Sequence, residues 1–361
     1  MAAALAPSRR RRRSARDRYP LPVRARGTTR LHAFALLACA VEAMGGWTVE
    51  AGKFEHRGAQ RANGSEHRGA QRANGSAAHA ALWSLRECSP HAAPCWPRDL
   101  YVSHIPKTGG SSLAHDIQQG AVPPLEPCNG LAASGIKVAG RMGATCNVWG
   151  SEGDVDEEVP KLAAVATAPL GLITMVREPL FHVRSMYAHC QSGFGMSLHN
   201  YTRISFSSWL RASLERPRPR RHSPGRTEHC NYDPMDKMTQ VLADGDLRRA
   251  VEVVDGAVFV GVTAHYDASV CLLRSVLIGR RACECAGAPR TGTRSGPGTN
   301  RGALNRAEEV RISTGDVELI EQLTRRDAIV YARGLSRFYD GIERFNLTCR
   351  LIGRNDTWRR D

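Results

Sequence analysis

The 361-residue chain is 42% hydrophobic and 24% charged, which suits one large domain with appendages and excludes a collagen-like or wholly disordered protein. Its net charge of +15 suggests nucleic acid, a membrane surface or an acidic substrate as partner. However, residues 1–30 hold ten arginines and one acid, so this leader carries +9 of the +15. The rest of the chain is nearly balanced and has no C2H2 or RNP-like motif, so we predict no nucleic-acid partner.

An apolar stretch at residues 31–41 follows the basic leader. It is shorter than the roughly 20 residues of a membrane span and matches the roughly 7–15 residues of a secretory apolar region. The pattern fits a signal anchor over residues 31–47, with residues 1–30 in the cytosol, or a signal peptide cleaved near Ala38-Cys39-Ala40. An organelle transit peptide, which is also Arg-rich and acid-poor, remains an alternative.

Sequons and cysteines favour the secretory route. Chance predicts about one Asn-x-Ser/Thr sequon in this composition, whereas five occur, at Asn63, Asn74, Asn200, Asn346 and Asn355. Apart from Cys39 in the apolar stretch, ten cysteines remain, an even number suited to disulfides in an oxidising lumen. Because their spacing lacks paired zinc-ligand elements, we predict disulfides and no metal.

The chain divides into a stem, a domain and a tail. Residues 55–76 are an 11-residue polar unit repeated twice, which cannot bury a core and lies in a predicted flexible stem over residues 48–87. The folded domain is expected at residues 88–345, followed by a C-terminal tail at 346–361. Two surface loops are expected inside the domain, at Arg216–Arg221 and at residues 286–303.

Short apolar strands alternate with helical stretches along the domain. Strands are expected at residues 100–105, 171–176 and 257–262. Helices are expected at residues 111–119, 156–166, 180–190, 206–214, 235–242 and 266–278, with a pair around 315–339. This alternation predicts a three-layer α/β domain with a mostly parallel sheet, in which ligands bind at the carboxyl ends of the strands.

The first predicted strand runs into His-Ile-Pro-Lys-Thr-Gly-Gly-Ser-Ser at residues 104–112 and then into a helix. A glycine-containing turn before a helix N-terminus offers backbone amides to a phosphate. The candidate phosphate-binding residues are Lys107, Thr108, Gly109, Gly110, Ser111 and Ser112. In a Walker A loop the lysine follows the second glycine, and no magnesium ligands are evident here, so a nucleotide kinase is disfavoured. A tight turn before a capped helix would look similar.

The second motif begins at the end of the strand at 171–176. Arg177-Glu178-Pro179 follows this strand, and the next helix carries Arg184 and Ser185. Arg177 and Ser185 can together bind one phosphate, through a bidentate guanidinium and a hydroxyl. Taken alone, the second motif is better interpreted as an ion pair of Arg177 with Glu178 and a solvated Ser185.

Together the two motifs resemble the PAPS-dependent sulfotransferases, of the Golgi membrane-bound glycan type related to the heparan sulfate 2-O- and 6-O-sulfotransferases. Residues 104–112 are similar to the 5′-phosphosulfate loop of that family, and residues 174–187 are similar to its 3′-phosphate motif. Residues 260–270 and 328–338 are similar to its later elements. The resemblance covers about residues 99–345.

The resemblance implies a P-loop-kinase-like sulfotransferase fold and transfer of a sulfuryl group from the co-substrate PAPS to a hydroxyl of a glycan or proteoglycan, without a metal. Lys107 would stabilise the leaving 5′-phosphate, residues 108–112 would hold it, and Arg177 with Ser185 would bind the 3′-phosphate. It also implies a single-pass type II Golgi membrane protein with a luminal catalytic domain; a secreted or luminal protein after signal cleavage is the alternative.

The general base is the part of this pattern that is hardest to assign. Relatives carry a His or Glu between the two motifs, where the only histidine is His115, our first candidate; His182 and His189 follow Arg177. The acids in that interval are Asp116, Glu126, Glu152, Asp154, Asp156, Glu157 and Glu158, the last five in an apparently solvated loop and helix start.

Residues 236–240 also depart from the stretch that relatives usually show near the acceptor. The alternative function is therefore a non-catalytic sulfotransferase-like module that binds PAPS, its product PAP or an anionic glycan. Under either function, the run Arg216–Arg221 would line a groove that binds an acidic acceptor, or it would form a solvated loop.

Overall fold

The computed structural model describes residues 99–123, 125–128, 146–164, 166, 170–191, 203–215, 230, 232–284 and 310–351. The predicted leader, anchor and stem lie outside these residues, as do Arg216–Arg221, the loop at 286–303 and the sequons at Asn63, Asn74, Asn200 and Asn355. Asn346 is described and is exposed. Every helix within the described ranges is too short or too polar to cross a membrane.

Four parallel strands form one sheet in the order β2-β1-β3-β4. They are β1 (Asp99–Ser103), β2 (Val148–Ser151), β3 (Leu170–Val176) and β4 (Phe259–Val262), and all of their residues are buried. Strands covered on both faces are typical of a parallel sheet, which confirms the predicted α/β class. Because Ser103 pairs with Thr174 and Val176 with Val262, the carboxyl ends of β1, β3 and β4 lie at the same edge.

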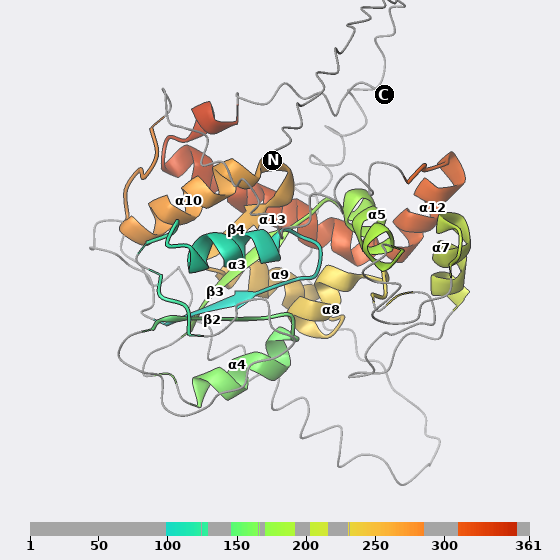
Figure 1. Cartoon of the computed structure of the whole chain (residues 1–361), viewed down its shortest axis with the longest axis horizontal. Coiled ribbons are helices and arrows are strands. Elements are labelled where there is room, and N and C mark those ends of the chain that lie inside the picture. Colours follow the sequence, from blue (N-terminus) through green and yellow to red (C-terminus); the bar gives the residue numbers. More distant parts are fainter. Residues whose placement is uncertain are drawn as a thin grey trace, which may run out of the picture. The chain divides into compact units, whose positions relative to one another are not determined.

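Helices cover both faces of this sheet (Figure 1). Helices α3 (Gly110–Gln118) and α10 (Tyr266–Ile278) lie on one side, and α4 (Val155–Ala163) and α8 (Lys237–Ala243) lie on the other. The short η2 (Thr263–His265) joins β4 to α10. The long α13 (Arg325–Arg344) packs against β4 and against α9 (Leu247–Gly256).

A second hydrophobic cluster lies beside the sheet, and most of its buried residues come from helices. Helices α5 (Pro179–Cys190), α7 (Phe206–Glu215) and α12 (Thr314–Leu323) contribute it, and Figure 1 shows them grouped on one side. Trp209 is its largest fully buried side chain. The disulfide Cys190–Cys230 is part of this cluster, so it fixes the end of α5, the helix of the second motif.

Disulfides connect much of the described domain, as the cysteine count predicts. The pairs are Cys128–Cys146, Cys190–Cys230 and Cys271–Cys283. Cys349, in the short η3 (Thr348–Arg350) near the C-terminal end of the described residues, is disulfide-bonded as well. Cys88, Cys95 and Cys285 lie outside the described residues.

The N-termini of α8 and α13 cap each other. The buried carboxylate of Asp327 accepts hydrogen bonds from the amides of Met238 and Thr239, at 2.9 and 2.8 Å, and from the Thr239 hydroxyl. In return, Oδ1 of Asp236 accepts from the Arg326 amide at 2.9 Å. Each carboxylate satisfies amides that have no partner within their own helix.

Candidate functional site

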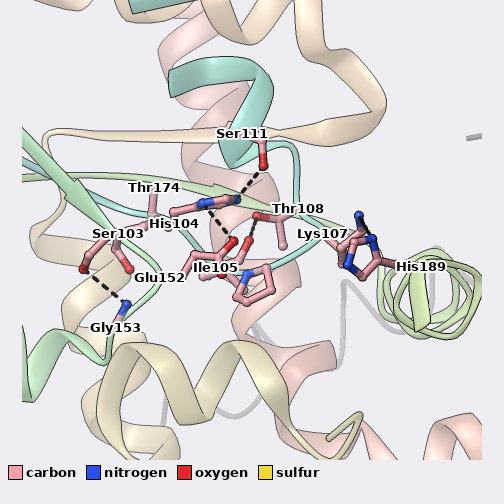
Figure 2. A network of polar contacts seen from close by, with 12 residues as sticks. Ser103, His104, Ile105, Lys107, Thr108, Ser111, Glu152, Gly153, Thr174 and His189 are labelled. Carbon is pink, nitrogen blue, oxygen red and sulfur yellow. Dashed lines mark hydrogen bonds and ion pairs between the residues drawn. The ribbon is translucent and has the colours of Figure 1, made fainter. Parts of the chain in front are cut away.

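The loop that follows β1 lies at the sheet edge where three strand ends meet, and Figure 2 shows its polar contacts. Two of its residues have left-handed backbone conformations: Gly109, with φ 94°, and Lys107, with φ 67°. Glycine adopts this conformation freely, but for a lysine the left-handed backbone costs about 1–2 kcal/mol. Such a strained residue persists only where its surroundings enforce it, and it commonly marks a functional site.

Gly110 lies directly against the ring of His104. A Cβ atom at position 110 would lie 2.0 Å from Cδ2 of His104, so only glycine fits there. The buried His104 ring places Nε2 3.3 Å from the Ser111 hydroxyl and Nδ1 3.4 Å from Oε1 of Glu152 (Figure 2). Burial, with the charge of Lys107, lowers the pKa of His104 to about 4, so this ring is neutral at physiological pH.

Lys107 is the cation nearest the start of α3. Its ammonium nitrogen lies 3.4 Å from Nδ1 of His189, which projects from α5 (Figure 2). Burial and the nearby Arg177 lower the pKa of Lys107 to about 8, and the negative charge of Glu152 only partly offsets this. A desolvated cation of this kind is stabilised by an incoming anion, which makes the loop suited to phosphate.

Arg177 joins the second motif to the first. Its Nη1 donates a hydrogen bond to the Lys107 carbonyl at 3.0 Å. Burial and the charge of Arg184 lower the pKa of Arg177 to about 10. The two motifs, 70 residues apart in the chain, therefore form one cationic centre, and Ser185 is buried on the same helix as Arg184.

Other hydrogen bonds fix the path of the loop. The Thr108 hydroxyl donates to the Ile105 carbonyl at 2.8 Å, so it is directed into the loop and not outwards to a ligand as the sequence suggested. The Thr263 hydroxyl, at the end of β4, donates to the carbonyls of Thr108 and Val176. His182 is buried, and its Nε2 lies 2.7 Å from the Pro106 carbonyl.

The N-terminus of α3 offers free amides. Its N-cap residue is Gly109, which has no side chain that could accept a hydrogen bond from these amides. The first amides of a helix have no intrahelical partner, and the helix dipole places positive potential there. The amides of Gly110, Ser111 and Ser112 are thus positioned, together with the exposed Ser111, to hold an anion beside Lys107.

Three of the four candidate bases have neighbours that define their roles. His182 must donate from Nε2, because a carbonyl only accepts, and burial lowers its pKa to about 3. Nδ1 of His189 faces the ammonium of Lys107 and accepts from it. Glu152 follows β2, and its side chain is 31% exposed and next to His104. His115 is half-buried on α3, and none of the loop contacts described above involves it.

The sequence interpretation of the acids at 152–158 as a solvated loop and helix start is confirmed for the loop before α4 and for the exposed Glu157, but it is wrong for Glu158, which is buried. Burial raises the pKa of Glu152, while the charges of Lys107 and Lys237 oppose the rise, so this carboxylate faces the cationic centre. Glu158 is buried on α4 and binds Lys161 at 3.0 Å. The sequence analysis predicts no strand at β2, so the position of Glu152 at a strand end does not follow from it.

The comparisons with known proteins add no family to this description. No protein-family model and no curated protein matches this chain. Among the residues that the structure describes, no group of three or more His, Cys, Asp or Glu side chains could hold a metal ion.

Proposed function

We propose that this chain transfers a sulfuryl group from PAPS to a hydroxyl of a glycan in the lumen of the secretory pathway. The observation that carries the proposal is the contact between Arg177 and the Lys107 carbonyl, which unites the two phosphate motifs at one edge of a parallel sheet. Ligands of such sheets bind at the carboxyl ends of the strands, next to helix N-termini. The fold assignment that goes with the proposal is the P-loop-kinase-like sulfotransferase fold.

The donor would bind across the ends of β1 and β3. Its 5′-phosphosulfate would occupy the N-terminus of α3, held by the amides of residues 110–112 and by the Ser111 and Ser112 hydroxyls. Its 3′-phosphate would bind Arg177 and Ser185, which distinguishes PAPS from ordinary adenylates. Gly109 and Gly110 allow the backbone to approach the phosphate, and Thr108 keeps the loop in shape through its bond to Ile105.

In the reaction, the acceptor oxygen forms a bond to sulfur while the bond from sulfur to the bridging 5′-phosphate oxygen breaks. The acceptor proton goes to a base, and the products are a sulfated glycan and adenosine 3′,5′-bisphosphate (PAP). Lys107 neutralises the negative charge that develops on the leaving phosphate oxygen. This lysine is the only cation of the loop itself, and its left-handed conformation and its contact with His189 fix its position.

Glu152 is the base that the geometry favours over His115. Its carboxylate lies 3.4 Å from Nδ1 of His104 at the end of β2, in the strand next to β1, and the charge of Lys107 acts on it. A carboxylate whose pKa is raised by burial is a stronger base than a solvated one. His182 and His189 are better described as positioning residues, because their ring nitrogens bind the Pro106 carbonyl and the Lys107 ammonium.

The compartment and acceptor belong to the same proposal. The three disulfides and the exposed sequon at Asn346 support a luminal domain. The type II Golgi topology and the glycan or proteoglycan acceptor rest on the resemblance, and the predicted anchor at residues 31–47 lies outside the described residues.

The test uses the full chain, purified from a secretory host, with sulfur-labelled PAPS and a panel of unsulfated and partly sulfated glycans. We expect transfer by the wild type, and at least 100-fold slower transfer by Glu152→Gln with unchanged PAP affinity. Glu157→Gln is the matched control, because Glu157 is an exposed carboxylate of the neighbouring helix that contacts Lys161. This control should retain transfer.

A second variant tests the nucleotide contact. Arg177→Ala should weaken PAP binding far more than AMP binding, because only PAP carries the 3′-phosphate. Absence of both PAP binding and transfer in the wild type would refute the proposal. PAP binding without transfer to any glycan of the panel would instead favour the non-catalytic module.

A further inference from the structure

A basic basin lies where α10 and α13 end. Its lining is Gly279, Arg280, Arg281, Arg344, Phe345 and Asn346, and its volume is about 430 Å³. That volume lies within the range of about 300–1,000 Å³ that is usual for ligand sites. Three of the six lining residues are exposed arginines, and no acid is among them.

Two of the three arginines, Arg281 and Arg344, contact their neighbours. Arg281 donates from Nε to the Cys283 carbonyl at 2.9 Å, and its Nη2 lies 3.7 Å from Sγ of Cys349. Both cysteines are disulfide-bonded, Cys283 to Cys271 of α10. The guanidinium of Arg344 stacks over the Phe345 ring at 5.4 Å from its centroid. The positive charges are therefore presented by a cross-linked surface, which reduces the entropy lost on binding an anion.

The basin is remote from the donor site. Helix α10 starts at Tyr266, directly after η2, and the hydroxyl of Thr263 at the start of η2 binds the loop at Thr108. Gly279 follows the last residue of α10. Thirteen helical residues span about 20 Å. Gly334 of α13 lies against Val176 at the carboxyl edge of the sheet. Gly341, about one helical turn before Arg344, lies against Leu272 in the middle of α10. The basin is thus at the opposite end of these helices from the loop.

We infer that this basin binds a segment of an acidic glycan chain through the sulfate or carboxylate groups of that chain. Several guanidinium groups in an open hollow suit repeated anionic groups, and each guanidinium matches the geometry of one such group. The choice of a glycan rests on the proposed function; the prediction of anion binding does not. The basin is a second contact for a long acceptor or product chain.

Asn346 also heads a sequon that ends at Thr348. A glycan attached to Asn346 would occupy the rim of the basin. All proteins in the test therefore carry Thr348→Ala, which removes the sequon at an exposed position and leaves the Asn346 side chain in place. This background is preferable to a change of Asn346, whose left-handed φ of 52° suits asparagine.

The test measures the affinity of the full chain for a fluorescent heparin dodecasaccharide, without PAPS. Arg280→Gln/Arg344→Gln should weaken binding about tenfold. The matched control is Arg311→Gln/Arg325→Gln, which removes two exposed arginines elsewhere, one of them at the other end of α13. The control should stay within about twofold of the background protein. Equal affinity of basin variant and background, or equal loss in the basin variant and the control, would overturn the inference.

Two further arms identify the ligand and separate this site from catalysis. A single-stranded RNA dodecamer should bind more weakly than the dodecasaccharide; tighter, basin-dependent binding of RNA would overturn the assignment to a glycan. Lys107→Ala should leave dodecasaccharide affinity at the basin unchanged while it abolishes transfer. If the wild type shows no transfer but the basin binds the dodecasaccharide, the proposed function fails and anion binding by the basin stands.

Discussion

The loop after β1 and the basin at the end of α10 are both cationic, but their charged side chains differ in solvent exposure. Lys107 and Arg177 are largely buried, and the pKa of each is lowered by burial and by a neighbouring cation. Arg280, Arg281 and Arg344 are exposed. A buried cation gains more from an arriving anion than a solvated cation does, because less water screens the pair.

This difference assigns different tasks to the two regions. The loop concentrates a few charges on one point, which suits the stabilisation of a single leaving phosphate. The basin spreads its charges over an open surface, which suits weak contacts with a repeating polyanion. The total charge of the chain does not distinguish these tasks, whereas the burial of each charge does.

The largest expected contrast is in transfer rate. Lys107→Met should lower kcat about 1,000-fold, because no other side chain of the loop supplies a positive charge. Arg344→Met, the same change of charge at the basin, should alter kcat by less than about twofold with a short acceptor. Steady-state rates with one short glycan acceptor check both, and a comparable loss in the two variants would contradict the contrast.

A second contrast concerns glycine. Gly110→Ala should reduce the free energy of unfolding by about 1–3 kcal/mol, because its Cβ would overlap the buried His104 ring. Gly279→Ala at the basin has open space around its Cβ but a left-handed φ of 70°, so it should cost only about 1 kcal/mol. Urea denaturation measures both. If Gly110→Ala is the less destabilising change, the close packing of the loop is wrong.

The smallest expected contrast is in pH dependence. The cation of Lys107 is present below its pKa of about 8 and is lost above it, so PAP affinity should fall roughly tenfold between pH 7 and pH 9.5. The basin depends on arginines, which stay charged over this range, so dodecasaccharide affinity should be nearly constant. Calorimetric titrations at four pH values check this. A flat PAP profile would show that Lys107 does not contact the nucleotide.

The sequence predicted the framework of the proposed donor site well. The strands at β1, β3 and β4 and the helices after them were found within about two residues, because apolar runs of buried parallel strands are easily recognised. The same alternation predicts that Lys107 and Arg177 lie at one edge of the sheet. Their contact depends on β1 lying beside β3, which the structure shows.

What the sequence missed depends on weak local signals. The strand β2 has four residues, including Gly150 and Ser151, and so lacks an apolar run. The loop that holds Glu152 is therefore predicted, but its place at the end of a strand is not. Helix α9 was also missed, although its buried Ala250, Val253 and Val254 have the spacing of one helical face. The role of Thr263 needs the position of β4 beside β3, which no local pattern shows.

The mutual caps of α8 and α13 determine when the domain can be completed during synthesis. Asp236 and Asp327 are 91 residues apart, and neither helix start has all of its hydrogen bonds until the other is present. Synthesis begins at the N-terminus, so β1, α3 and β3 are made long before α8 can gain its hydrogen bonds to α13. Lys237, whose charge acts on Glu152, begins α8, so the surroundings of this proposed base are complete only when α13 has been made.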